Sequence, residues 1–174
     1  MDRPDFQPVL IGERIEIRPI RADDWDDMFA AAADPLIWDV HPVRQRYKEP
    51  FFREFFDSGL ASRMAFAILD RRTGRIIGSS RYHDYQPELG ELEIGWTFLA
   101  RSHWGGSYNR EIKQLMLAHA FQFVGTVIFM VGETNWRSQR AIEKIGGIKR
   151  PRLRERAYHG VSVAHIVYEI TKPE

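Results

Sequence analysis

The segment from Arg101 to Arg110, with the sequence RSHWGGSYNR, has the residue types of an anion-binding turn. It lies between a predicted strand and a long predicted helix. The adjacent glycines Gly105 and Gly106 allow the backbone to take up positive φ and to approach a ligand closely. The first free N–H groups of the following helix, with the helix dipole behind them, would point to one place. Such a cradle suits a phosphate or a pyrophosphate.

The same residue types also occur in ordinary strand-to-helix turns, so this segment does not by itself require a ligand. It lacks the Gly-Lys-Ser/Thr of a Walker loop and the G-x-G-x-x-G of a dinucleotide-binding turn. A second polar segment runs from Asn135 to the glycine pair Gly146-Gly147. Asn135 is a good helix N-cap and Ser138 follows one turn later, a pattern that a cap alone would also produce.

The elements that position these segments follow from the spacing of apolar residues. Alternation predicts strands, helical spacing predicts helices, and turns with glycine or proline separate them. The predicted strands are 14–20, 64–70, 76–85, 91–99, 127–133, 148–157 and 161–170. The predicted helices are one capped by Asp23 or Asp24 and running through Ala33, and those at 50–60, 106–124 and 136–145. The order β-α-α-β-β-β-α-β-α-β-β predicts one α/β domain over residues 1–174 with a mixed sheet.

The predicted strand 91–99 carries the side chains that would face a site at its end. Strict alternation places the apolar side chains Leu92, Ile94, Trp96 and Phe98 on one face. The same alternation places the polar side chains on the other face, namely Glu91, Glu93 and Thr97.

The composition excludes several classes of protein. The chain has 174 residues, of which 44% are hydrophobic and 28% charged, as in a packed domain. It has no cysteine, which excludes a disulfide scaffold, a thiol nucleophile and a thiolate metal site. Its histidines show no His-x-x-x-His spacing, so we expect no metal. No run of about 18 apolar residues and no signal-peptide pattern occurs, so we expect a soluble cytoplasmic protein with no membrane partner.

The charge is small in total but uneven along the chain. The net charge is +1, which argues against a nucleic-acid partner, including one bound through residues 149–156 (KRPRLRER). Residues 135–156, however, carry 8 Lys or Arg and 2 Asp or Glu. A small anionic ligand would fit this asymmetry, and so would a solvated basic face.

The two polar segments together are more specific than either one. A strand, a Trp-Gly-Gly loop with a helix, a strand, and then N-x-x-S leading to K-x-G-G resemble the GNAT superfamily of acetyl-CoA-dependent N-acetyltransferases. The chain looks most like the branch of the ribosomal-protein alanine (N-terminal) acetyltransferases. The resemblance covers nearly the whole chain. It implies a central mixed, mostly antiparallel sheet of about seven strands with helices on both faces.

The resemblance also implies where acetyl-CoA binds. In the family the cosubstrate lies in a gap between the two central strands, where the fourth strand holds the pantetheine arm; here that strand contributes Trp96, Thr97 and Phe98. Ser102 stands where the family has Gln or Arg, and Arg101 is the candidate replacement cation. The phosphates would lie against Gly105, Gly106, Ser107, Tyr108, Asn109 and Arg110, with Asn135 on the pantetheine and Arg140 near the nucleotide.

Acetyl transfer needs a neutral amine, a base for its proton and a donor for the leaving sulfur. Glu93 is the first candidate base, and Glu91 and Glu155 are the alternatives. Ile142 stands where many family members have a tyrosine that acts as the general acid. Ser138 is therefore the candidate proton donor to the sulfur.

The predicted function is therefore N-acetyl transfer from acetyl-CoA to a primary amine, with a protein or peptide N-terminus as the preferred acceptor. Such an α-amino group has a pKa near 7.7–8.0, so it loses its proton more readily than a lysine. The alternatives are a small amine, such as an amino acid or antibiotic, and a non-catalytic module that only binds acyl-CoA. In the family the first two helices border the substrate cleft, so Trp38, His41 and the aromatic residues of 51–56 would shape it. The oligomeric state stays open, a homodimer included.

Overall fold

The computed structural model describes residues 4–174, which form a layered α/β fold. The helices and strands, in chain order, are β1 (Leu10–Ile11), β2 (Ile15–Pro19), α1 (Trp25–Ala32), α2 (Glu49–Ser62), β3 (Ala65–Asp70), β4 (Ile76–Gln86), β5 (Glu91–Leu99), α3 (Tyr108–Ala120), β6 (Thr126–Gly132), α4 (Trp136–Glu143), β7 (Ile148–Lys149), β8 (Arg154–Tyr158) and β9 (Val161–Thr171). Short 3-10 turns at Ala22–Asp24, Pro35–Ile37 and Arg101–His103 join some of them.

Within residues 4–174 the strands form a nine-stranded sheet in the order β1-β2-β3-β4-β5-β6-β9-β7, and β8 also pairs with β9. Every pair is antiparallel except β5 with β6. The predicted mixed, mostly antiparallel sheet is therefore confirmed. The extra strands are β1 and β7, of two residues each. The predicted strand 148–157 is divided into β7 and β8 around Pro151, which has no N–H for a ladder.

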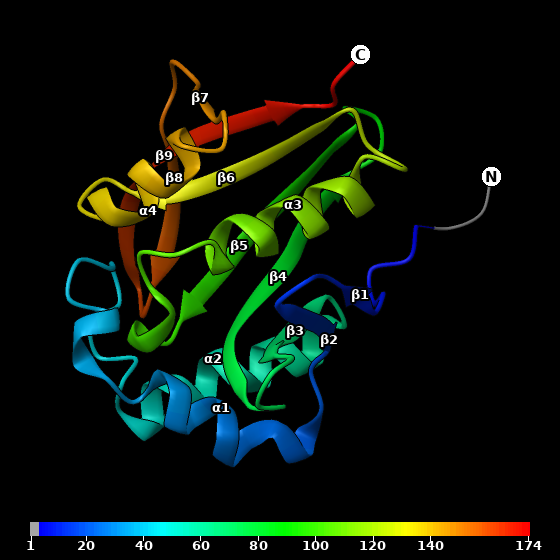
Figure 1. Ribbon diagram of the computed structural model, residues 1–174. Coiled ribbons are helices and arrows are strands. Elements are labelled where there is room, and N and C mark those ends of the chain that lie inside the picture. Colours follow the sequence, from blue (N-terminus) through cyan, green and yellow to red (C-terminus); the bar gives the residue numbers. More distant parts are fainter. Residues whose placement is uncertain (1–3) are drawn as a thin grey trace.

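Helices cover both faces of the sheet, as predicted (Figure 1). On one face, Ile112 and Met116 of α3 are fully buried against the sheet, and Ile142 of α4 joins the same core. On the other face, α1 and α2 contribute a second core that includes Met28 and Phe52. None of the helices among residues 4–174 has the length and apolar composition needed to cross a membrane.

The register of β5 differs from the predicted alternation. Leu92 and Ile94 belong to the core under α3, but Trp96 and Phe98 pack into the core under α1 and α2. Thr97 instead faces α3, where its hydroxyl accepts a hydrogen bond from Lys113. The reason is a β-bulge, since Trp96 has a φ of 50° and the pairing with β4 shifts here. The prediction that Trp96 and Phe98 share a face with Leu92 is therefore wrong.

Candidate active site

A cavity of about 780 Å³ opens where β5 and β6 cease to pair. Their parallel pairing ends at Glu93 and Ile128, and the two strands then diverge, with β6 running toward α4 (Figure 1). Residues of α3 and α4 line one part of the cavity. The segment 37–46 and the strands β8 and β9 line another part. The cavity thus reaches both faces of the sheet.

One end of the cavity is the turn that precedes α3. Gly105 has a φ of 73°, as the sequence predicted for a glycine of this turn, and a side chain at Gly106 would meet no atom within 4 Å. The first bond within α3 joins the Glu111 N–H to the Ser107 carbonyl at 2.9 Å. The N–H groups of the first turn therefore have no helical partner, and Ser107, Asn109 and Arg110 line the cavity, which is compatible with an anion cradle.

The start of α4 forms the opposite wall. The Asn135 side-chain oxygen accepts the Ser138 N–H at 3.2 Å, so the predicted N-cap is confirmed. This bond fixes the side chain of Asn135, and Asn135 and Ser138 both line the cavity. Among residues 4–174, no hydrogen bond engages the amide nitrogen of Asn135 or the hydroxyl of Ser138, so both are available to a ligand.

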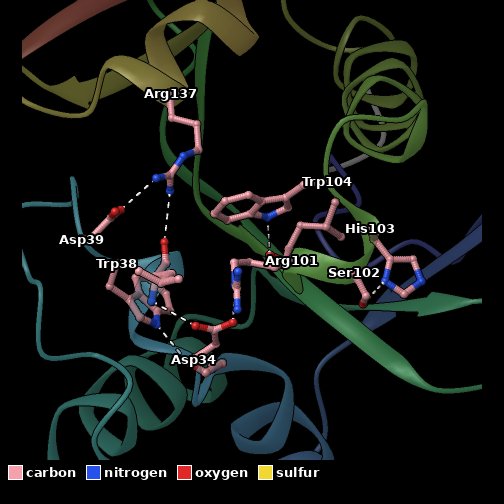
Figure 2. Close-up of polar contacts among 11 residues, drawn as sticks. Asp34, Trp38, Asp39, Arg101, Ser102, His103, Trp104 and Arg137 are labelled. Atoms are coloured by element: carbon pink, nitrogen blue, oxygen red, sulfur yellow. Dashed lines mark hydrogen bonds and ion pairs between the residues drawn. The ribbon is translucent and has the colours of Figure 1, made fainter.

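Most of the predicted site residues line this cavity. They are Trp96, Thr97, Phe98, Gly105, Gly106, Ser107, Asn109, Arg110, Asn135, Ser138 and Arg140. Arg101, Tyr108 and Glu93 lie outside the lining. The Arg101 guanidinium is paired with the carboxylate of Asp34 (Figure 2). The Tyr108 ring packs against the ring of His103, with 4.8 Å between centroids.

A set of contacts around Trp104 joins the walls of the cavity (Figure 2). Arg137 of α4 donates to the Asp39 carboxylate at 2.8 Å and to the Leu36 carbonyl at 3.3 Å. The Arg137 guanidinium also lies 4.4 Å from the centre of the Trp104 ring. The Trp104 indole N–H donates to the Leu99 carbonyl at 2.7 Å. These contacts connect α4, the end of β5 and the segment after α1.

A comparison with known protein families matches residues 14–148 to the acetyltransferase (GNAT) domain. The chain belongs to the GNAT acetyltransferase family. A search of the curated proteins found no match. GNAT enzymes use acetyl-CoA, and the divergent strands beside an anion cradle fit its long pantetheine arm and its pyrophosphate.

Solved structures show the same fold. A GCN5-related N-acetyltransferase from Brucella melitensis is 17% identical, with a TM-score of 0.80 over 97% of this chain and 80% of that one. A provisional ribosomal-protein-serine acetyltransferase from Vibrio cholerae is 15% identical, with a TM-score of 0.77 over 97% of this chain and 99% of that one. Mycobacterium smegmatis RimJ, in complex with CoA-disulfide, is 19% identical, with a TM-score of 0.69 over 90% of this chain and 81% of that one.

Glu93 of this GNAT domain is 1% exposed and is held by a buried ion pair. Its two carboxylate oxygens accept hydrogen bonds from Arg156 of β8 at 2.8 and 3.0 Å. Arg156 itself lines the cavity. The alternatives have other partners: Glu91 pairs with Arg150, and Glu155 accepts from the Ser162 hydroxyl. Of the three carboxylates, only Glu93 is bonded to a residue of the cavity lining.

Lys113 is a cavity residue that sequence reasoning missed. It is 5% exposed and lies on α3 one turn after Asn109, among the core positions Ile112 and Met116. Its ammonium group donates to the Thr97 hydroxyl at 2.7 Å. Burial lowers the pKa of Lys113 to about 7. The signal was its spacing of four residues from Asn109, which aligns both side chains along one helix face.

Proposed function

We propose that this GNAT domain transfers the acetyl group of acetyl-CoA to a primary amine, which reaches the cavity from the α1–α2 face of the sheet. The observation that best supports this proposal is the cavity between β5 and β6, which would join an anion cradle on one face of the sheet to an aromatic pocket on the other. The cradle suits the pyrophosphate of the cosubstrate. The pocket, with Trp38 and Tyr158, would exclude water from the acceptor amine.

The proposed cosubstrate contacts follow from the lining. Backbone N–H groups of the turn and of the first turn of α3, that of Tyr108 included, would hold the pyrophosphate. The backbone of β5 at 96–98 and the amide of Asn135 would hold the pantetheine, and Arg140 would lie at the nucleotide end. Arg101 would contribute only after leaving its ion pair with Asp34.

Bound acetyl-CoA supplies an acyl group that is activated as a thioester. The transfer forms a C–N bond and breaks a C–S bond, while a proton leaves the amine and the sulfur requires one. Ser138 is the proposed donor to the sulfur, because its hydroxyl lines the cavity and Ile142 occupies the position of the usual tyrosine. Glu93 is the proposed base, and the proton of the amine would reach it through a water molecule beside Arg156.

A peptide N-terminus is one proposed acceptor, and likeness to the Vibrio cholerae protein and to RimJ supports it. A small amine is the other. The two differ in the space and charge that the acceptor pocket must accommodate.

Calorimetric titration with acetyl-CoA, with ATP and NAD in parallel, tests the cosubstrate. We expect micromolar binding of acetyl-CoA alone. Gly106→Asp would place a negative charge in the cradle and lower the affinity at least about tenfold. Gly106→Ala is the matched control, because its methyl group meets no atom within 4 Å. Gly105 is a poorer choice, since its φ of 73° strains any side chain.

The outcomes separate the alternatives. No binding of acetyl-CoA, or equal affinity in the alanine and aspartate variants, would refute the proposed cosubstrate site. Tight binding without acetyl transfer to any amine would instead indicate a non-catalytic acyl-CoA-binding module.

A further inference from the structure

The acceptor side of the cavity contains a buried arginine that has no ion-pair partner among the described residues. Arg46 is 8% exposed and lines the cavity. Its guanidinium lies against the faces of three aromatic rings, at 5.7 Å from the centre of Trp38, 5.1 Å from Phe55 and 5.8 Å from Tyr158. Within residues 4–174 it forms no ion pair, and burial lowers the pKa of Arg46 to about 10.

The neighbouring charges compensate it only in part: the exposed Glu54 of α2 acts on it without forming an ion pair, and burial has the larger effect on its pKa. Arg81, 5% exposed, donates to the Phe55 carbonyl at 3.0 Å, and its Nε has no hydrogen-bond partner among the described residues. Arg156 is paired with Glu93, so that carboxylate forms no ion pair with Arg46 or Arg81. Three guanidinium groups thus share one buried carboxylate on this face. A buried charge without an ion-pair partner is strongly unfavourable, so this face of the cavity favours an added anion.

The hydrogen bond pattern around His41 marks where that anion would bind. The Nδ1 atom of His41 accepts the Val43 N–H at 2.9 Å, so in the neutral ring the proton is on Nε2. Burial and the adjacent Arg46 charge keep the pKa of His41 well below its usual value, which makes the neutral ring the relevant form. The Nε2 atom lies 3.2 Å from Nη1 of Arg46. Two donors therefore meet without an acceptor between them.

We propose that Arg46 and His41 form a subsite for an oxyanion of the acetyl acceptor, so that the acceptor is a small primary amine bearing a carboxylate or a phosphate. The inference rests on the proposed acetyl transfer and narrows its acceptor. An oxygen of such a group would accept from both donors at once. The guanidinium fork also matches a carboxylate or phosphate geometrically.

The same charges explain how the reacting amine would lose its proton. A positive guanidinium near the acceptor disfavours a second positive charge, so it lowers the pKa of an amine bound there. Polyamines and other cationic acceptors are therefore excluded by repulsion. In an amine that carries a carboxylate, the guanidinium attracts the carboxylate and lowers the pKa of the amino group.

Acetyl transfer to matched amines tests the subsite by thiol release. Glycine and β-alanine carry a carboxylate, O-phosphoethanolamine carries a phosphate, and glycinamide and ethanolamine are the uncharged counterparts; an uncharged peptide amide represents a peptide N-terminus. Rates are corrected for the neutral fraction of each amine. We expect kcat/KM to be about 100-fold higher for anionic acceptors. The carboxylate and phosphate arms identify which oxyanion is preferred.

Arg46→Met should remove this preference while leaving the KM for acetyl-CoA unchanged, and Arg46→Lys, which keeps the charge, should retain part of it. The exposed Arg44 of the same segment gives the control variant Arg44→Met, which should behave as the unmodified protein. Equal rates for charged and uncharged amines, preference for the peptide amide, or bound acetyl-CoA without transfer to any anionic amine would overturn the subsite. Failure to bind acetyl-CoA would refute the proposed function instead.

Discussion

Replacing Lys113 by methionine removes a buried ammonium group while keeping a side chain of similar length. The pKa of Lys113 falls from 10.5 to about 7 on folding, because burial disfavours its charged form. Between these two values the unfolded chain binds a proton that the folded chain does not, so stability rises with pH across this window. Each pH unit contributes about 1.36 kcal/mol, which amounts to about 3 kcal/mol between pH 7 and pH 9.5 after partial titration.

Urea unfolding at several pH values measures this contribution directly. We expect the unfolding free energy of the unmodified protein to rise relative to Lys113→Met by about 3 kcal/mol between pH 7 and pH 9.5. Near pH 7 the methionine variant should be the more stable protein. The exposed Lys172 provides the control, Lys172→Met, which should follow the unmodified protein throughout. If the stability curves of the unmodified protein and of Lys113→Met ran parallel over this pH range, the folded and unfolded chains would hold this proton equally, and the reasoning would fail.

Three further substitutions test the packing and the site. Gly78→Ala should destabilise the fold by about 2 kcal/mol in urea unfolding, because its methyl group would collide with the Phe98 carbonyl oxygen across the β4–β5 ladder. Asp24→Ala should lower the free energy of unfolding by about 3 kcal/mol, because the half-buried Arg18 loses the carboxylate to which it donates two hydrogen bonds of 2.8 Å. Glu93→Gln should lower kcat in a thiol-release assay with the calorimetric affinity for acetyl-CoA nearly intact; full turnover would place the base elsewhere.

The periodicity of the sequence was sufficient for the order of the α-helices and of the strands longer than two residues. Alternation predicted a strand at 91–99, which is β5 to the residue, and helical spacing predicted α3 within a few residues at each end. The Asn135 cap and the positive φ of Gly105 were also predictable. These features depend on short-range chemistry: a cap, a turn residue or a period is determined by neighbours along the chain.

Long-range contacts determined what the sequence could not specify. The bulge at Trp96 moves its side chain and that of Phe98 to the α1–α2 face, and a period of two cannot reveal one inserted residue. Likewise, Arg101 lies next to the cradle in sequence, but its charge is taken by Asp34 from 67 residues away. A pattern shows which residue types are near one another in the chain, whereas the pairing of charges depends on the folded distances.

The sequence by itself determined a GNAT-like order of strands and helices and the position of the glycine turn before α3, because glycines, caps and periodicity act locally. Only the tertiary structure determined the chemistry of the acceptor side. Arg46 and His41 are five residues apart in sequence, yet their unsatisfied donors become meaningful only because β8 and α2 bury them together. Burial converts an ordinary arginine into a charge that needs a partner, and burial is a property of the whole fold.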